Sequence, residues 1–133
     1  MAENTEPEAA LIWKRTDDFK DLYCNNVRFE SSVWDLKVLF GTLDQGNPNS
    51  TEYQPGVYFH TGISMPWVQA KIALYQLYVA ILFQEMSNGT IQVPAQVRPP
   101  RMKDVLPDLA KQPAGQHVAE RADQARNLIF GTE

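Results

Sequence analysis

The feature that most restricts the fold of this chain is a long apolar segment between Pro66 and Gly89. Pro66 suits the first turn of a helix and Gly89 suits a helix end, so the segment is predicted to form one helix of roughly 30 Å. Small and amide side chains recur at helical spacing in one narrow stripe. The large apolar residues that fill most of the remaining circumference are Trp67, Val68, Ile72, Leu74, Tyr75, Leu77, Tyr78, Val79, Ile81, Leu82 and Phe83. Such a helix needs cover on more than one side.

Three segments before the helix alternate between apolar and polar residues, which is typical of half-buried strands. They are residues 22–30, 34–41 and 57–65. The first two are close enough in sequence to form an antiparallel hairpin, and the third extends it. Alternation places Val57, Phe59, Thr61, Ile63 and Met65 on one face of the third strand. The predicted fold class is therefore α+β, with a three-stranded antiparallel sheet packed on one long apolar helix.

The chain is predicted to hold one domain with an arm at each end, since 133 residues and 15.1 kDa are enough for one core. The predicted parts are a flexible acidic arm over residues 1–20, a β-β-β-α core over 21–90 and a Pro-rich arm over 91–133 that is extended and ends in a weak helix. Trp13 is a candidate anchor for the first arm. Residues 43–56, rich in Gly, Pro, Asn and Ser, are predicted to form a mobile loop.

Because a three-stranded sheet covers one side of a helix, the other side is predicted to bury itself against a second copy of the chain. The residues assigned to this homo-oligomer interface, of a dimer or a larger assembly, are Trp67, Ile72, Tyr75, Tyr78, Val79 and Leu82. Two alternatives remain open: a close crossing at Ala73 and Ala80 with glutamines bonding across it, or the C-terminal segment folding back over the helix. The arms could bind another protein. Lys71 and the glutamines argue against a membrane span.

The composition favours a cytoplasmic binding or assembly module and no enzyme. The net charge is -4, Cys24 is the only cysteine, and the N-terminus lacks the pattern of a secretion signal. Nucleotide-binding, metalloprotease and hydrolase motifs are absent from the sequence, so no catalytic residue and no cofactor is assigned. His60 and His117 are two isolated histidines, and no metal site is predicted from them.

A second hypothesis is a surface for single-stranded nucleic acid on the outer face of the sheet. Cations interleaved with aromatic rings are typical of such surfaces. The residues assigned to it are Arg28, Lys37, Tyr58 and His60. The acidic total charge disfavours this alternative, because it gives no overall attraction for phosphates.

Three short motifs resemble the bacterial domain of unknown function 3467 family. The matching positions are Tyr23, Asn25, Val27 and Arg28, then Asp35, Phe40 and Gly41, then Pro66, Ala70 and Lys71. The resemblance covers about residues 22 to 88 and departs from the pattern at Met65, where serine usually precedes the proline. It implies a compact bacterial module of hairpin, strand and helix, and it supplies no catalytic residue.

Overall fold

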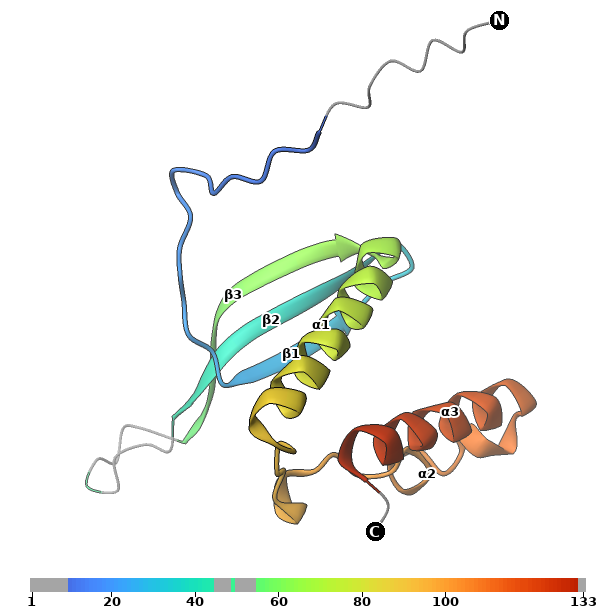
Figure 1. Cartoon of the computed structure of the whole chain (residues 1–133). Coiled ribbons are helices and arrows are strands. Elements are labelled where there is room, and N and C mark those ends of the chain that lie inside the picture. Colours follow the sequence, from blue (N-terminus) through green and yellow to red (C-terminus); the bar gives the residue numbers. More distant parts are fainter. Residues whose placement is uncertain (1–9, 45–48, 50–54, 132–133) are drawn as a thin grey trace, which may run out of the picture. The chain divides into compact units, whose positions relative to one another are not determined.

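The protein combines one antiparallel sheet with helices, which confirms the predicted α+β class (Figure 1). The computed structural model describes residues 10–44, 49 and 55–131. The elements in chain order are β1 (Asn26–Ser31), β2 (Asp35–Asp44), β3 (Gly56–Pro66), α1 (Trp67–Asn88), η1 (Ala95–Val97), α2 (Met102–Val105), η2 (Leu109–Lys111) and α3 (Pro113–Phe130). The strands lie in the order β1-β2-β3 and each pair is antiparallel, as predicted.

A serine-based turn connects β1 to β2. The Ser32 hydroxyl accepts hydrogen bonds from the amides of Trp34 and Asp35 at 3.1 and 3.0 Å, and it lies 2.9 Å from the Asp35 carboxylate. Side-chain bonds of this kind compete with regular strand pairing and favour a tight turn. Trp34 therefore lies in the turn and is 85% exposed, which corrects the predicted start of the second strand at residue 34.

A β-bulge in β3 changes which residues share a face. Phe40 pairs with Thr61, but the next residue, Gly41, pairs with Phe59, so His60 is an extra residue on β3. The His60 ring lies 2.8 Å from the Thr61 hydroxyl, a contact between neighbouring side chains that regular alternation would separate.

The bulge makes the predicted alternation of the third strand wrong. Thr61, Ile63 and Met65 pair with Phe40, Val38 and Leu36, which share one face of β2. Val57 and Phe59 pair with Leu43 and Gly41, which lie on the other face. One inserted residue shifts every later side chain to the opposite face, because the side-chain period of a strand is two.

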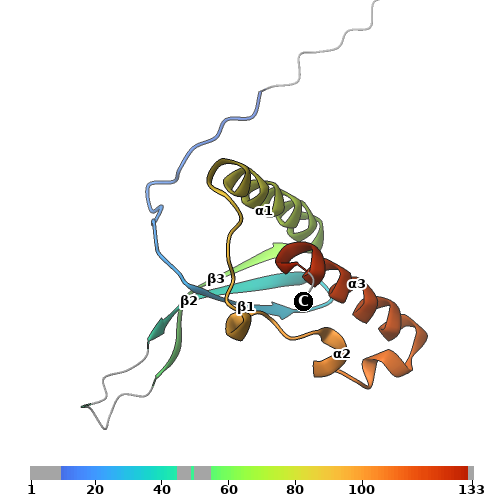
Figure 2. The same cartoon turned by 60° about the horizontal axis from the view of Figure 1, so that its bottom comes forward.

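The predicted helix ends are confirmed by α1. Gly89 follows the last residue with a φ of 84°, and its amide donates to the Glu85 carbonyl at 2.9 Å. Glycine adopts this left-handed conformation without the steric cost that other residues meet. The helix packs on the sheet (Figures 1 and 2). In its first half the half-buried residues are Ala70 and Ala73, yet no residue of α1 is fully buried.

The chain divides into two compact units, Met1–Gln76 and Leu77–Glu133, and the division falls inside α1. The first unit holds the sheet and the first half of α1, with Val38 on β2 as its buried apolar residue. The second unit holds the rest of α1 and the segment predicted to be an extended arm. That segment instead forms η1, α2 and η2 before α3.

Side chains of α3 hold the Pro-rich segment of the second unit. The Asp123 carboxylate accepts the Met102 amide at 2.9 Å, and the Arg126 Nε donates to the Pro99 carbonyl at 2.7 Å. Gly115 and Ala119 are buried on α3, where α2 and η2 pack against it (Figure 2). The prolines prevent one continuous helix, as expected, but short helical turns fit between them.

The described part of the N-terminal segment, residues 10–20, contains no helix or strand. The Arg15 guanidinium lies 4.8 Å from the centre of the Phe19 ring. Trp13 is 90% exposed, so it does not act as the expected anchor within this chain. The first nine residues of the predicted acidic arm and most of the predicted 43–56 loop lie outside the described residues.

Replacement of Gly41 tests the tight contact between β2 and β3. A Cβ atom at position 41 would lie 2.7 Å from the Tyr58 carbonyl oxygen and 2.9 Å from a Phe59 ring carbon. We expect Gly41→Ala to lower the free energy of unfolding by about 1–3 kcal/mol, as overpacking does. Gly56→Ala, where nothing lies within 4 Å, is the control. Equal urea midpoints for the two variants would contradict this account.

Candidate interface along the long helix

Six apolar residues form one continuous stripe along α1, which we call the α1 seam. They alternate at spacings of four and three residues, and they are Val68, Ile72, Tyr75, Val79, Leu82 and Met86. At 3.6 residues per turn these positions stay on one side of the helix. Ala70 and Ala73 lie on the opposite side. The α1 seam therefore lies on the side of the helix opposite Ala70 and Ala73, which are the half-buried residues of its first half.

Most of the α1 seam is exposed. Val68 and Met86, near its two ends, are each 74% exposed, and Tyr75 is 70% exposed. Ile72 and Leu82 are each 46% exposed, whereas Val79 is half-buried. Single exposed apolar residues are ordinary in proteins, but a contiguous apolar stripe is typical of a binding surface.

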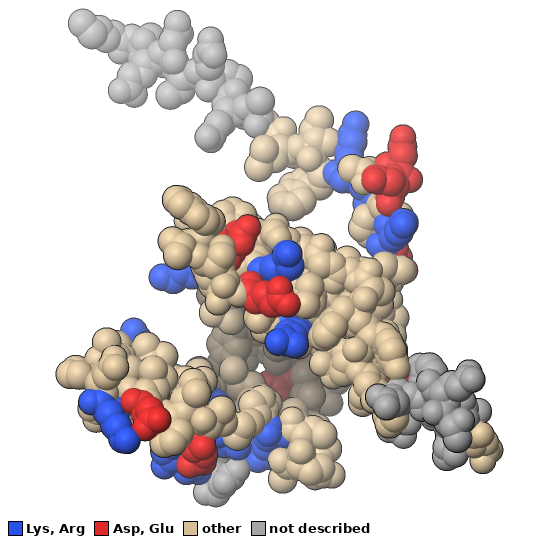
Figure 3. Space-filling model, turned by 180° about the vertical axis from the view of Figure 1, so that it is seen from behind, with Lys and Arg blue, Asp and Glu red and all other residues tan. Residues whose placement is uncertain are grey.

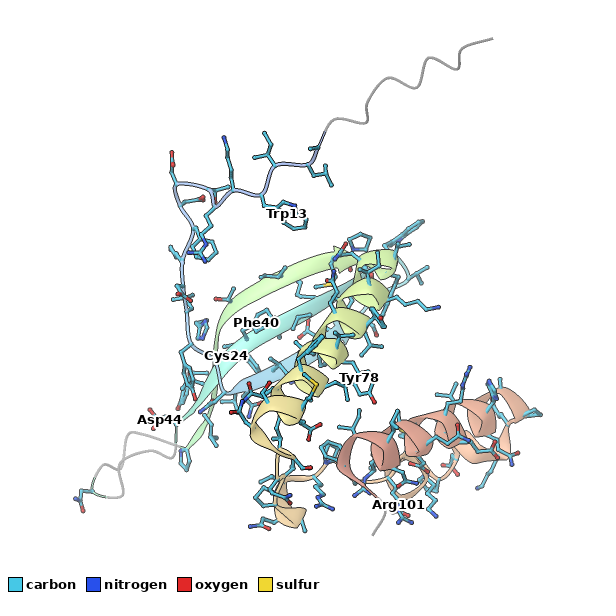
Figure 4. All side chains as sticks on the ribbon, viewed as in Figure 1. Trp13, Cys24, Phe40, Asp44, Tyr78 and Arg101 are labelled. Atoms are coloured by element: carbon cyan, nitrogen blue, oxygen red, sulfur yellow. The ribbon has the colours of Figure 1, made fainter. Side chains whose placement is uncertain are left out.

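Four of the six predicted interface residues belong to this seam: Ile72, Tyr75, Val79 and Leu82. Trp67 and Tyr78 point in other directions around the helix (Figure 4 labels Tyr78). The predicted set does not include Val68 and Met86, which extend the stripe at both ends. The signal for them was present in the sequence as the unbroken alternation of four- and three-residue spacings.

Trp67 has a contact of its own within the first unit. Its indole Nε1 donates a hydrogen bond to the Ser32 carbonyl at 3.0 Å. This bond connects the first residue of α1 to the turn between β1 and β2, and the ring remains 43% exposed. Trp67 therefore orients the start of the helix relative to the sheet.

The strand register separates the residues assigned to a nucleic-acid surface. Arg28 pairs with Leu39 and Glu30 pairs with Lys37, so Arg28 and Lys37 share a face of the sheet with an acidic residue between them. The view from behind shows charges of both signs interleaved on the molecule (Figure 3). Alternating signs weaken any net attraction for phosphates at this face.

Tyr58 and His60 lie on the other face because of the bulge. Tyr58 pairs with Thr42, which shares a face with Phe40. The His60 Nε2 lies 3.1 Å from the Tyr23 carbonyl oxygen, and its Nδ1 lies beside the Thr61 hydroxyl. Both ring nitrogens of His60 thus have partners within the first unit. The structure does not bring the four assigned residues together.

The remaining candidates for chemistry are sparse in the part of the chain that the structure describes. No group of three or more His, Cys, Asp or Glu side chains there could hold a metal ion. Cys24 is a free, half-buried thiol before β1 (Figure 4). A cavity of about 310 Å³ in the second unit is lined by Glu85, Arg98 and mainly apolar residues, and the Arg98 Nε donates to the Val93 carbonyl at 2.9 Å.

Comparisons with protein-family models, with curated proteins and with solved structures find no match to this chain. The resemblance to the domain of unknown function 3467 family therefore stays a prediction. Among the described residues, the helices are all too short or too polar to cross a membrane.

Removal of the Trp67 hydrogen bond should weaken the first unit without affecting self-association. Trp67→Phe keeps an aromatic ring and loses the indole donor, so we expect the free energy of unfolding to fall by about 0.5–1.5 kcal/mol. Trp34→Phe is the matched control, because Trp34 is 85% exposed in the turn. Urea unfolding followed by circular dichroism measures both. An unchanged midpoint in Trp67→Phe would show that the bond contributes nothing.

Proposed function

We propose that this protein is a non-enzymatic assembly module of the cytoplasm that associates with copies of itself through the α1 seam. The observation that carries the proposal is a 22-residue helix with no buried residue and a continuous apolar stripe that faces away from Ala70 and Ala73. In a single copy these large side chains remain in contact with water. Association removes them from water without any change in the fold.

The size of the hydrophobic gain supports association. A Val, Leu, Ile, Phe or Met side chain contributes about 1.5–3 kcal/mol when it passes from exposed to buried. Twelve partly exposed side chains, six from each of two copies, then contribute on the order of 15 kcal/mol. The translational and rotational freedom that two copies lose on association costs about 4–15 kcal/mol. The balance is favourable only when most of the stripe is buried, so we expect the interface to extend along the whole seam.

Self-association is favoured over the nucleic-acid alternative by the arrangement of side chains. The apolar residues form one uninterrupted line, whereas the cations and aromatic rings of the alternative lie on two faces of the sheet. A stacking surface needs both on the same face.

The test is the molar mass of Val79→Glu. We expect size-exclusion chromatography with light scattering to give the wild-type protein a mass of at least two chains, each of 15.1 kDa. A carboxylate in the middle of an apolar interface loses its hydration, so Val79→Glu should shift the mass to that of one chain. Circular dichroism checks that the variant retains its helices.

Gln84→Glu is the control for charge alone. Gln84 is exposed on α1 and lies on the side of the helix away from the seam, so this variant should keep the wild-type mass. A wild-type protein of one-chain mass at every concentration would overturn the proposal. A Val79→Glu variant that is folded and keeps the wild-type mass would exclude the α1 seam as the interface.

A further inference from the structure

The partner of the α1 seam is suggested by the period of the seam itself. Apolar residues that alternate at four and three residues repeat every 3.5 residues on average, which is the spacing of a two-helix seam. The repeat is unbroken from Val68 to Met86. A straight helix drifts by about 20° per heptad against this spacing, which over less than three heptads is small enough to keep one side in contact.

The α1 seam also matches a second copy of itself when the two helices run in opposite directions and are aligned at the level of Leu77. Val68 then lies opposite Met86 of a second copy, Ile72 opposite Leu82, and Tyr75 opposite Val79. Each layer combines a larger side chain with a smaller one or joins two of equal size. A parallel pair in register would place Tyr75 opposite Tyr75 and Val79 opposite Val79, which overfills one layer and leaves the next one underfilled.

The charged residues of α1 support the same antiparallel arrangement. Lys71 and Glu85 are the only charged residues of α1, and with Tyr78 they flank one side of the seam at seven-residue spacing. Reversal about Leu77 places Lys71 of each copy beside Glu85 of the other, so two opposite-charge pairs form. A parallel pair brings Lys71 to Gln76 and forms neither. Shifting the reversed pair by one heptad also removes both charge pairs.

Glu85 keeps the capacity to accept this partner. Its Oε2 accepts the Ile91 amide at 2.9 Å. An ionised carboxylate offers about four acceptor positions over two oxygens, so one hydrogen bond leaves room for an ammonium group. Lys71 lies exposed on the first half of the helix.

We propose that α1 pairs with α1 of a second copy of this chain in antiparallel direction, centred on Leu77, with Lys71 of each copy beside Glu85 of the other. This inference rests on the self-association proposed above and adds its direction and register. Tyr78 of the two copies would then meet at the twofold axis.

Cysteine cross-linking separates the two directions. On a Cys24→Ser background, Val68→Cys and Met86→Cys are prepared separately and then refolded together. The antiparallel pair places positions 68 and 86 opposite each other, so mild oxidation should give a cross-linked dimer in the mixture. Either variant alone should give none, because equivalent positions lie about 27 Å apart, at 1.5 Å for each of 18 residues.

The outcomes distinguish this inference from the proposed function. Cross-linking of Val68→Cys alone would establish a parallel pair and overturn the antiparallel inference while self-association stands. A dimeric wild-type protein with no cross-link in any sample would also overturn the inference. A wild-type protein of one-chain mass would overturn both.

A charge reversal tests the register. Lys71→Glu places two carboxylates together at each end of the antiparallel pair, and we expect the dimer Kd to rise about tenfold or more. The double variant Lys71→Glu with Glu85→Lys restores opposite charges and should return the Kd to within about threefold of wild type. Lys14→Glu, at an exposed lysine outside α1, is the control and should change nothing. Equal Kd values for all the proteins would contradict the assigned register.

Discussion

The rest of this structure depends on the mismatch between the apolar surface of α1 and the area that one small sheet covers. A three-stranded sheet packs against one side of a helix, and in α1 the half-buried side of the first half carries Ala70 and Ala73. The larger side chains lie elsewhere on the circumference. Apolar surface that stays in water gives up about 25 cal/mol per Å², and the exposed side chains of α1 forgo that stabilisation in a single copy.

Two local features, a turn and a bulge, orient the start of α1 and assign the side chains of β3 to the faces of the sheet. The turn at Ser32 brings its carbonyl to the Trp67 indole, which orients the start of α1. The bulge at His60 places Thr61, Ile63 and Met65 on the face of the buried Val38, whereas Val57 and Phe59 lie on the other face, with Arg28 and Lys37. The face of Arg28 and Lys37 therefore carries apolar as well as charged side chains, and the α1 seam is one of the exposed apolar surfaces of the described residues.

Much of this architecture was predictable from local patterns. Pro66 and Gly89 bracket the helix because one suits a helix start and the other adopts a left-handed conformation at its end. Strand alternation predicted the hairpin and the third strand. Four residues of the α1 seam followed from the excess of apolar circumference. Val68 and Met86 were equally visible in the sequence, since their spacing continues the same repeat, but that reading requires the period to be taken as 3.5 residues.

The sequence by itself determined which elements form and where the long helix begins and ends, because both depend on side chains within a few residues of each other. Only the tertiary structure decided the faces of β3 and the folding of the Pro-rich segment onto α3. Those features depend on partners distant in sequence, such as Gly41 opposite Phe59 and Asp123 bonded to the Met102 amide. A local pattern does not encode the contacts that make one arrangement more stable than another.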